Sequence, residues 1–547
     1  MLRPLLRFLA AYFFLVAVAC AIVKREFSLH PVEGEVIASV WKDGALVRRV
    51  VLAHEGARDP RIDQALADSG GELVSEVVVA DAPILVKPEI AFAMSFVAGK
   101  DGLKATLGND TVYVTPDDLL VRQVYDHGIH VPALSLALGI DTKVLVSLLA
   151  EKLGTNTDRL LERATLRRVR IERRIPAERP RITADTLSPA EVKSAVIAGA
   201  NYLARGVSPD GHFRYAVNAP TDQDLPGYDW ARHAGATFFL AQAAALTGDR
   251  VLTDATLRAA TLLRGPAMVA CGANRCIGDE PVVYLGASAL ALLAFTEIVE
   301  KKIDDSYRSQ ILELTRFMRS QQRNDGEFMH EYDRQGNRAI DYQYLYYSSE
   351  ASLGLARAYA ITQDKSDLAA AVRGLRNLVG PAWSFFGDRY YFGEEHWTCQ
   401  AMAVLWKYSP DPEALDFCLR WQGFGRALQQ KEGDSYFDAD GAIGVGPVVT
   451  PRLTPVASRC EAAVATLDVA RRSGVAASEI AILDDQLRHA LALLLRQQFR
   501  PGPRHLFKSP DRVEGAIPGS EVDWELRIDY TQHAGSAMVR WLEQNGR

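Results

Sequence analysis

The sequence lacks a surplus of basic residues, low-complexity tracts and repeated long apolar runs. Its 62 Lys and Arg residues are outnumbered by 68 Asp and Glu residues, which gives a formal net charge of −6. Proteins that bind nucleic acids carry a strongly basic surface, so this balance predicts no nucleic-acid partner. Only one apolar run approaches the length of a membrane span. At 547 residues the chain is expected to hold more than one domain.

The single apolar run occupies Phe8–Val23 and follows two arginines. It predicts a membrane anchor or signal segment over residues 1–26. We favour an uncleaved inner-membrane anchor that leaves the body of the protein in the periplasm, where envelope proteins are potential partners. Two alternatives stay open: a signal peptide cleaved after the small residues Ala17 and Ala19, and a lipoprotein modified at Cys20.

Residues 33–178 predict an α+β domain. Two strand patterns flank a turn at Asp43-Gly44, and a helical pattern then stops at Gly70. A further strand follows, and then a hairpin that precedes a helix opened by Pro116. The segment Gly99–Leu119 resembles the AMMECR-type domain family. Because the activity of that family is poorly defined, the resemblance implies only a scaffold or partner-binding module.

Residues 185–547 repeat one pattern six times, in which a helix begins with a polar residue followed by small residues. The copies begin at Tyr228, Val282, Tyr344, Glu394, Ala457 and Arg527. Starts spaced by about 50 to 70 residues are typical of helical-hairpin arrays, and another helical pattern lies between successive copies. Six hairpins predict a closed all-α (α/α)6 toroid with the small-residue helices inside. The mouth where six helix starts meet is a natural ligand pocket.

Aligning the copies on their small residues defines one polar position near each helix start. This column reads His233, Gly286, Glu350, Gln400, Glu461 and His533. Four of its members can act as acid or base, so we predict Glu350, Glu461, His233 and His533 to be catalytic. The alternative is that the column reflects the preference of helix starts for acidic residues, which suits the glutamates but not a cationic histidine.

The first and last copies share the pattern Asp-x-x-x-His. Asp229 precedes His233 and Asp529 precedes His533, and a spacing of four residues places both side chains on one helix face. Each aspartate could orient its imidazole and raise its basicity, or simply cap the helix. If the toroid closes, the two pairs lie side by side.

The C-terminal unit resembles the six-hairpin glycosidase-like superfamily. The resemblance is carried by the six helix starts and by the segments DGHFRYAV at Asp210 and DGEFMHEYD at Asp325. It implies glycoside hydrolase, polysaccharide lyase or sugar epimerase activity, with the ligand bound in the mouth. The Gly-His-Gly pattern of lanthionine cyclases is absent, as are the Asp-rich and repeated Gln-Trp patterns of terpene cyclases.

Aromatic and charged residues near the helix starts predict how a sugar polymer would bind. Aromatic faces stack on the apolar C–H faces of sugars, and Arg offers a planar fork for carboxylate, sulfate or phosphate, so an anionic glycan is favoured. Packing of the rings and internal neutralisation of the arginines are the alternatives. The predicted substrate-binding residues are Arg232, Arg459, Gln400, His396, Glu395, Tyr228, Tyr347, Trp397 and Tyr530.

Two mechanisms fit these residues. A hydrolase needs two carboxylates that flank the scissile bond, for which Glu350 and Glu461 could face each other across the mouth. Further candidate carboxylates come from loops, namely Glu394, Glu395, Asp438 and Asp440. A lyase or epimerase needs a base next to a uronate carboxylate, for which His233 or His533 could serve. The sequence leaves this choice open, and it predicts no cofactor and no metal ion.

The cysteines leave three alternatives. Cys271 and Cys276 frame a short loop that a disulfide could close. Cys399 and Cys460 occupy equivalent positions in neighbouring copies and could pack, form a disulfide, or bind zinc with His396. The sequence as a whole predicts a membrane-anchored protein that binds and processes an envelope or exported polysaccharide by acid/base chemistry. The rival is a non-catalytic component that holds a polymer in the same mouth.

Overall fold

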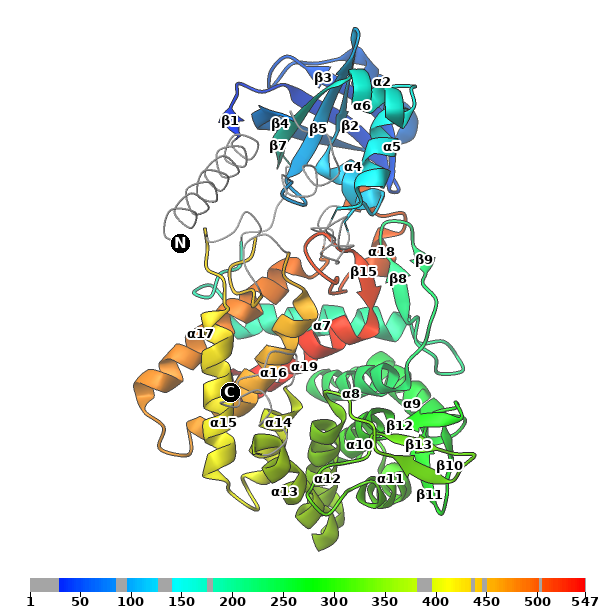
Figure 1. Cartoon of the computed structure of the whole chain (residues 1–547), viewed down its shortest axis with the longest axis vertical. Coiled ribbons are helices and arrows are strands. Elements are labelled where there is room, and N and C mark those ends of the chain that lie inside the picture. The colour runs from blue at the N-terminus through cyan, green and yellow to red at the C-terminus, as the bar shows by residue number, and fades with distance from the viewer. Residues whose placement is uncertain are drawn as a thin grey trace, which may run out of the picture.

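The computed structural model describes residues 29–84, 96–125, 140–174, 181–380, 396–433, 438–444, 450–500 and 504–546. Figure 1 shows a mainly β unit at one end of the chain and a large helical unit below it. Among the described helices, none combines the length and apolarity needed to cross a membrane. The predicted anchor over residues 1–26 lies outside the described residues.

The N-terminal unit is an antiparallel sheet with helices packed on it. Its strands follow the order β3-β2-β4-β7-β5-β6, with β1 paired to β4. The strands are β1 (His30–Pro31), β2 (Val36–Lys42), β3 (Ala45–Leu52), β4 (Glu72–Pro83), β5 (Asp101–Leu107), β6 (Asp110–Val114) and β7 (Thr165–Arg174). The helices are α2 (Pro60–Ser69), α4 (Pro116–Val121), α5 (Thr142–Lys152) and α6 (Thr157–Arg163).

Local turn chemistry in this unit matches the expectations from sequence. Asp43 and Gly44 both have positive φ in the turn between β2 and β3, and Gly70 caps α2 in the left-handed conformation at φ 64°. Thr115 forms a capping box with Asp118 at the start of α4, where Pro116 takes the first helical position. The α+β character predicted for this region is therefore confirmed.

A buried charge cluster joins the N-terminal sheet to the helical unit. The carboxylate of Asp117 accepts a hydrogen bond from Nε2 of His505 at 2.9 Å and also pairs with Arg173. The backbone N–H of Gly44 donates to the carbonyl of His505 at 3.1 Å. The sheet is thus fixed beside the segment that leads into the last helix of the chain.

Six inner helices form a closed ring. Each contacts the next in chain order, and the last contacts the first, so the predicted (α/α)6 toroid is confirmed by the contacts α8-α10-α12-α14-α16-α19-α8. The inner helices are α8 (Trp230–Thr247), α10 (Leu285–Glu300), α12 (Tyr347–Thr362), α14 (Trp397–Leu405), α16 (Leu453–Ala470) and α19 (Ile528–Asn545). The outer helices are α7 (Pro189–Arg205), α9 (Arg250–Arg264), α11 (Arg308–Ser320), α13 (Lys365–Val379), α15 (Pro412–Ala427) and α17 (Ala477–Gln497).

Short elements connect these helices, mostly before the inner-helix starts. The strands are β8 (Ala216–Asn218), β9 (Gln223–Asp224), β10 (Met268–Cys271), β11 (Asn274–Ile277), β12 (Val282–Tyr284), β13 (Glu331–Asp333), β14 (Arg338–Ile340) and β15 (Glu525–Arg527). The remaining helical turns are η2 (Asp305–Tyr307), η4 (Arg504–Leu506) and α18 (Pro510–Val513). Figure 1 shows β8, β9, β15 and α18 between the toroid and the N-terminal sheet.

Small residues allow the inner helices to crowd, as the sequence predicts. A Cβ on Gly286 would lie 2.3 Å from the ring of Tyr347 on the next inner helix. A Cβ on Gly535 of α19 would lie 2.2 Å from the ring of Phe239 on α8. Real Cβ atoms do not approach so closely, so glycine at these positions sets the spacing of the ring.

Four turns place a glycine against the backbone of an outer helix. In each turn the glycine has positive φ, and a Cβ would lie 2.0–2.5 Å from a helix carbonyl oxygen. The pairs are Gly211 with Arg258, Gly326 with Arg373, Gly441 with His489, and Gly515 with Ala198. The turns that follow Asp210 and Asp325 therefore have structural counterparts at Gly441 and Gly515. Each of these turns packs against an outer helix of the ring.

Replacing Gly326 with alanine is expected to lower the free energy of unfolding by about 2 kcal/mol or more, because φ is +96° and the added methyl group meets a backbone carbonyl. Gly423 on α15 is the matched control, since a Cβ there meets nothing within 4 Å. Gly423→Ala should be neutral or stabilise by about 0.5–1 kcal/mol through helix propensity. Urea unfolding of both variants measures the difference. Equal changes in the free energy of unfolding would contradict a role of Gly326 in packing its turn against α13.

Two disulfides lie within the described residues. Cys271–Cys276 joins the paired strands β10 and β11, and Cys399–Cys418 joins α14 to α15, with Cα atoms 5.9 and 5.7 Å apart. A Cys399–Cys460 disulfide is therefore ruled out, and Cys460 is a buried free thiol. The physical reason is that each inner helix packs against the outer helix of its own hairpin, which brings Cys418 to Cys399.

Candidate active site

Helical periodicity shows which residues of the inner helices face the toroid axis. Residues seven apart on an α-helix are rotated by only about 20°, whereas residues nine apart lie on opposite faces. A cavity at the far end of the ring is lined by Arg357, Asp468 and Arg540. Each lies seven residues after a member of the predicted column, namely Glu350, Glu461 and His533. These three column members therefore face the axis, about 10 Å nearer the helix starts.

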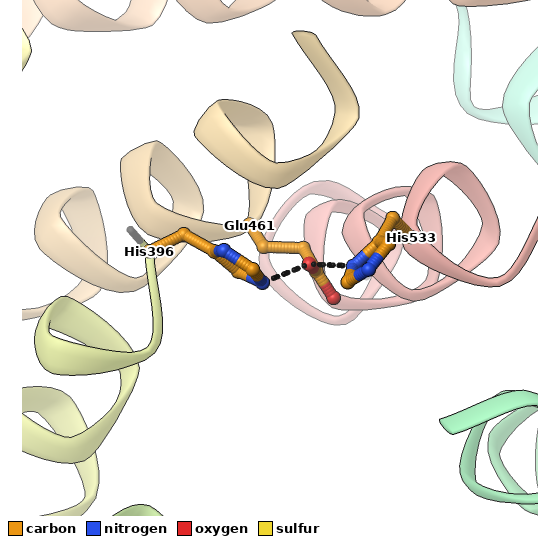
Figure 2. Close-up of side chains that lie close together, drawn as sticks. All are labelled: His396, Glu461 and His533. Carbon is orange, nitrogen blue, oxygen red and sulfur yellow. Dashed lines mark hydrogen bonds and ion pairs between the residues drawn. The ribbon is translucent and has the colours of Figure 1, made fainter. Parts of the chain in front are cut away.

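His396, Glu461 and His533 converge from three neighbouring segments of the inner ring (Figure 2). Oε2 of Glu461 lies 2.8 Å from Nδ1 of His533 and 3.0 Å from Nε2 of His396. His396 immediately precedes α14, Glu461 lies inside α16, and His533 lies near the start of α19. We call these three residues the His-Glu-His cluster.

The cluster is buried but reachable from one side. The side chain of Glu461 is 0 % exposed, that of His396 is 3 % exposed and that of His533 is 13 % exposed. Burial alone would raise the pKa of Glu461, but the charge of His533 and the contacts with both imidazoles outweigh it and lower the pKa to about 2. Glu461 is thus a fixed carboxylate at neutral pH, and it orients one nitrogen of each imidazole.

The same three side chains could hold a metal ion. Their donor atoms all lie within 4.8 Å of one another, and two imidazoles with one carboxylate are a common ligand set for divalent metals. The 2.8 Å separation equally matches a direct hydrogen bond between His533 and Glu461, whereas the 3.0 Å contact of His396 has the distance of an ion pair without hydrogen-bond geometry. The sequence prediction of no metal ion stays a prediction, and it is tested below.

Arg232 links the first and last copies beside this cluster. It pairs with Asp229 at 3.5 Å and with Asp529 at 3.4 Å, and it donates to the hydroxyl of Tyr215 at 3.1 Å. Asp529 also pairs with Arg527 at 2.6 Å. The two aspartates do lie together, as closure of the toroid predicts. However, they neutralise Arg232, so its proposed role in binding an anionic glycan has to be revised.

Neither aspartate hydrogen-bonds the histidine four residues later. Asp229 accepts from the backbone N–H of Arg232 and caps α8, which is the alternative that the sequence left open. His533 uses Nδ1 to contact Glu461 rather than Asp529. The partner that orients His533 therefore comes from the neighbouring inner helix and not from its own.

His233 is not part of the site, which corrects the prediction that it is a catalytic base. Its Nε2 lies 3.0 Å from the carbonyl of Ala259 on the outer helix α9, and its Nδ1 lies 2.6 Å from the hydroxyl of Tyr228. Burial lowers the pKa of His233 to about 4, so the ring is neutral. His233 lies nine residues before Gln242, which lines the cavity at the far end, and therefore on the opposite face of α8.

Arg459 is likewise turned away from the axis. It lies nine residues before Asp468, and its Cδ is 3.9 Å from the position of a Cβ on Gly425 in the outer helix α15. Its predicted role in binding substrate at the mouth is therefore wrong. With Arg232 neutralised as well, the two arginines no longer favour an anionic ligand at the mouth.

Tyr347 and Glu350 occupy the opposite part of the mouth. Both lie against Gly286, where their side chains fill the space that a Cβ would take. Burial raises the pKa of the Tyr347 hydroxyl, and the nearby charges of Glu350 and Asp229 raise it further. Glu350 faces the axis, and its catalytic role stays a prediction.

The predicted aromatic residues differ in exposure: Trp397 and Tyr530 are buried, whereas Tyr228 is exposed. Trp397 and Tyr530 are each 2 % exposed, and Trp397 lies behind the histidines, with its ring centre 4.4 Å from that of His396. These two residues pack the site and do not face a ligand. Tyr228 is 37 % exposed but donates to or accepts from His233, so it mainly supports the first helix start.

An exposed aromatic cluster does border the mouth. Tyr284, Tyr342, Tyr344 and Tyr347 contact one another with ring centres 5.0–6.5 Å apart. Tyr284 was missed at the sequence level, although its position directly before the second inner helix is a signal that could have identified it. We call these four residues the tyrosine cluster.

The remaining predicted residues have mixed outcomes. Gln400 is fully buried, and neither polar atom of its side chain has a hydrogen-bond partner among the described residues. Asp438 pairs with Arg181 and Arg496, and Asp440 pairs with His489, so both loop carboxylates are structural. Glu394 and Glu395 lie outside the described residues.

Comparisons with known proteins give similarity in fold only. No protein-family model and no curated protein matches the chain. A solved D-mannose isomerase is similar at 11% identity and a TM-score of 0.49, covering 65% of this chain and 98% of its own. A cellobiose 2-epimerase from Spirochaeta thermophila has 10% identity and a TM-score of 0.47 over 65% and 98% of the two chains. A GH76 alpha-mannanase from Bacteroides thetaiotaomicron has 10% identity and a TM-score of 0.46 over 66% and 98%.

All three TM-scores are below 0.5. The toroid assignment therefore rests on the closed ring of helix contacts in this chain. The resemblance of the N-terminal unit to the AMMECR-type domain family finds no support in these comparisons.

Proposed function

We propose that this protein is a carbohydrate-active enzyme whose chemistry is proton transfer by histidine. The observation that carries the proposal is the His-Glu-His cluster, in which one buried, ionised carboxylate holds two imidazoles at the toroid axis. Carboxylate-oriented imidazoles are the usual general acids and bases near neutral pH.

The cluster favours an epimerase, isomerase or lyase over a hydrolase. A hydrolase of the usual kind needs a protonated carboxylic acid beside a second carboxylate. Glu461 has a pKa of about 2 and both of its neighbours in the cluster are histidines, so it cannot donate a proton near pH 7. The two imidazoles lie on either side of Glu461. One of them can remove a proton from a sugar carbon, and the other can return a proton to that carbon from a different direction.

The two histidines have different access to a ligand. His533 is the more exposed of the pair, so we assign it the role of the base that meets the substrate. His396 is the second acid/base group, and Glu461 is a positioning residue that acts through both rings. The tyrosine cluster supports a saccharide as substrate, because aromatic faces stack on sugar rings.

A turnover screen tests the proposal. The purified protein is incubated with neutral saccharides and with uronate-containing polysaccharides, and proton NMR follows the products. We expect an epimer, ketose or unsaturated product from at least one saccharide. Hydrolysis products alone would contradict the proton-transfer mechanism. Saccharide binding without any product would favour the rival, a non-catalytic component that holds a polymer in the mouth.

Metal dependence gives a separate prediction. If the cluster works by hydrogen bonding alone, prior treatment with EDTA should leave turnover unchanged. Added Zn²⁺ should then inhibit, because neutral imidazole nitrogens and a carboxylate within 4.8 Å of one another would bind it and lose their acid/base capacity. Loss of turnover with EDTA and its recovery with one specific divalent ion would instead assign the cluster as a catalytic metal site.

We further propose that the protein is anchored in the inner membrane and faces the periplasm. Two disulfides in the described residues support an oxidising compartment. Fractionation of cells tests this proposal. The full chain should sediment with membranes and be accessible to protease from the periplasm, and a chain without residues 1–26 should be soluble and folded. A full chain found in the soluble cytosolic fraction would contradict the anchor.

A further inference from the structure

The cavity that is lined by Arg357, Asp468 and Arg540 opens at the end of the toroid opposite the His-Glu-His cluster. It has a volume of about 400 Å³ and is lined by residues from all six inner helices, including Gln242, Glu297, Arg357, Val404, Asp468 and Arg540. Because these side chains lie about two to four turns beyond the helix starts, the cavity is on the axis but at the other mouth. We call it the axial cavity.

The carboxylates of the axial cavity are already paired. Glu297 lies 2.6 Å and Glu300 2.5 Å from the guanidinium of Arg357. Glu543 lies 2.8 Å from the amine of Lys301. Asp468 pairs with Arg472 at the end of α16. Lys407 also lines the cavity and its charge acts on Glu300, so four cations balance these four carboxylates.

The guanidinium of Arg540 has no such partner. Within the described part of the chain it makes no hydrogen bond and no ion pair, and its Nε atom is buried. Its guanidinium carbon lies 5.9 Å from the ring centre of Phe238. Burial and the nearby charge of Arg357 lower the pKa of Arg540, and the more weakly acting charges of Glu297, Glu461 and Glu543 oppose this shift. Only Nε of this guanidinium is buried without a partner, so its other N–H groups can donate to an anion bound in the cavity.

A neutral acceptor faces the same space. The side chain of Gln242 is 4 % exposed, and its Oε1 atom has no hydrogen-bond partner among the described residues. A ligand that satisfies both groups must offer an anionic oxygen to Arg540 and an O–H or N–H donor to Gln242. The volume of the cavity is in the range of small-molecule sites.

From these observations we infer that the axial cavity binds a small hydroxyl-bearing anion of the sugar-acid class, with Arg540 holding the carboxylate and Gln242 accepting from a hydroxyl. The inner-helix C-termini at this end carry partial negative charge, which favours cations. That effect fades within the last turn, and Arg540 lies more than one turn before Asn545. The site is separate from the proposed active site, and the inference does not depend on the proposed reaction.

Calorimetric titration of the full chain tests the site with D-glucuronate, acetate and D-glucose as probes. Glucuronate, which carries both the charge and the hydroxyls, should bind most tightly. Arg540→Gln should weaken glucuronate binding by about 10- to 100-fold, as expected for the loss of one charge-assisted contact. Gln242→Leu should reduce the preference for glucuronate over acetate. Arg316→Gln on the exposed face of the outer helix α11 is the matched control and should bind as the unaltered protein does.

The His533→Asn variant separates the two sites. Glucuronate binding that persists in His533→Asn and is lost in Arg540→Gln belongs to the axial cavity. Binding lost in His533→Asn and kept in Arg540→Gln, or no binding of glucuronate to the unaltered protein, would overturn the inference. If Arg540→Gln does not fold by circular dichroism, Arg540→Lys takes its place, and its affinity should fall several-fold because a point charge replaces the planar fork.

Discussion

Replacing His533 with asparagine is expected to lower turnover by about 10²- to 10⁴-fold, the usual contribution of a general acid or base. Asparagine keeps a polar group of similar reach but cannot take up a proton near neutral pH. His533 is the more exposed histidine of the cluster, and its Nδ1 is already engaged by Glu461 at 2.8 Å. We therefore assign proton transfer to the other ring nitrogen, Nε2.

The control for this variant is His54→Asn, because His54 is an exposed histidine in the N-terminal sheet unit. It should leave turnover unchanged. Saccharide affinity in His533→Asn should change much less than turnover, since the tyrosine cluster is untouched. An affinity loss as large as the turnover loss would show that His533 binds the substrate rather than acting on it.

Replacing Glu461 with glutamine should cause the second large effect, on both turnover and stability. Glutamine keeps the size of the side chain but removes the charge that orients His396 and His533. We expect turnover to fall by about two or more orders of magnitude. Glu479→Gln, at an exposed position on the outer helix α17, is the control and should have no such effect.

The stability effect of Glu461→Gln should depend on pH in a defined direction. The pKa of Glu461 is about 2 in the folded protein and 4.5 ordinarily, so the folded state favours the ionised form. This stabilisation, on the order of 3 kcal/mol, is fully present above about pH 4.5 and is lost as the pH falls toward 2. Urea unfolding at several pH values should show this loss in the unaltered protein and a flatter profile in the variant. Parallel profiles would contradict a charged Glu461.

Sequence patterns were sufficient to predict the toroid but not every residue at its axis. Small residues at six helix starts reflect the crowding of the inner ring, and Gly286 and Gly535 show that contact directly. The column, however, was aligned on small residues and did not take into account which face of each helix a residue occupies. His233 is nine residues from Gln242 and therefore faces α9, whereas the seven-residue spacing from Glu461 to Asp468 keeps Glu461 on the axis.

Contacts between distant segments could not be predicted from sequence. His396 could be expected to bind substrate because it precedes an inner helix, but its contact with Glu461 depends on how α14 and α16 pack. Cys399 pairs with Cys418 because the two helices of one hairpin lie side by side. Asp117 and His505, which fix the N-terminal sheet to the toroid, are 388 residues apart in the chain.

The most direct test of the central claim is hydrogen exchange at substrate carbon in D₂O. The protein is incubated with the saccharide that the turnover screen identifies, and mass spectrometry with NMR locates any deuterium. Proton transfer through the His-Glu-His cluster predicts one solvent deuterium at the reacting carbon of an epimerised or isomerised product. For a lyase, the deuterium should appear at that carbon in the recovered substrate. The His533→Asn variant should show no incorporation above background. Products formed without any carbon-bound deuterium, or the same incorporation in His533→Asn, would contradict the account.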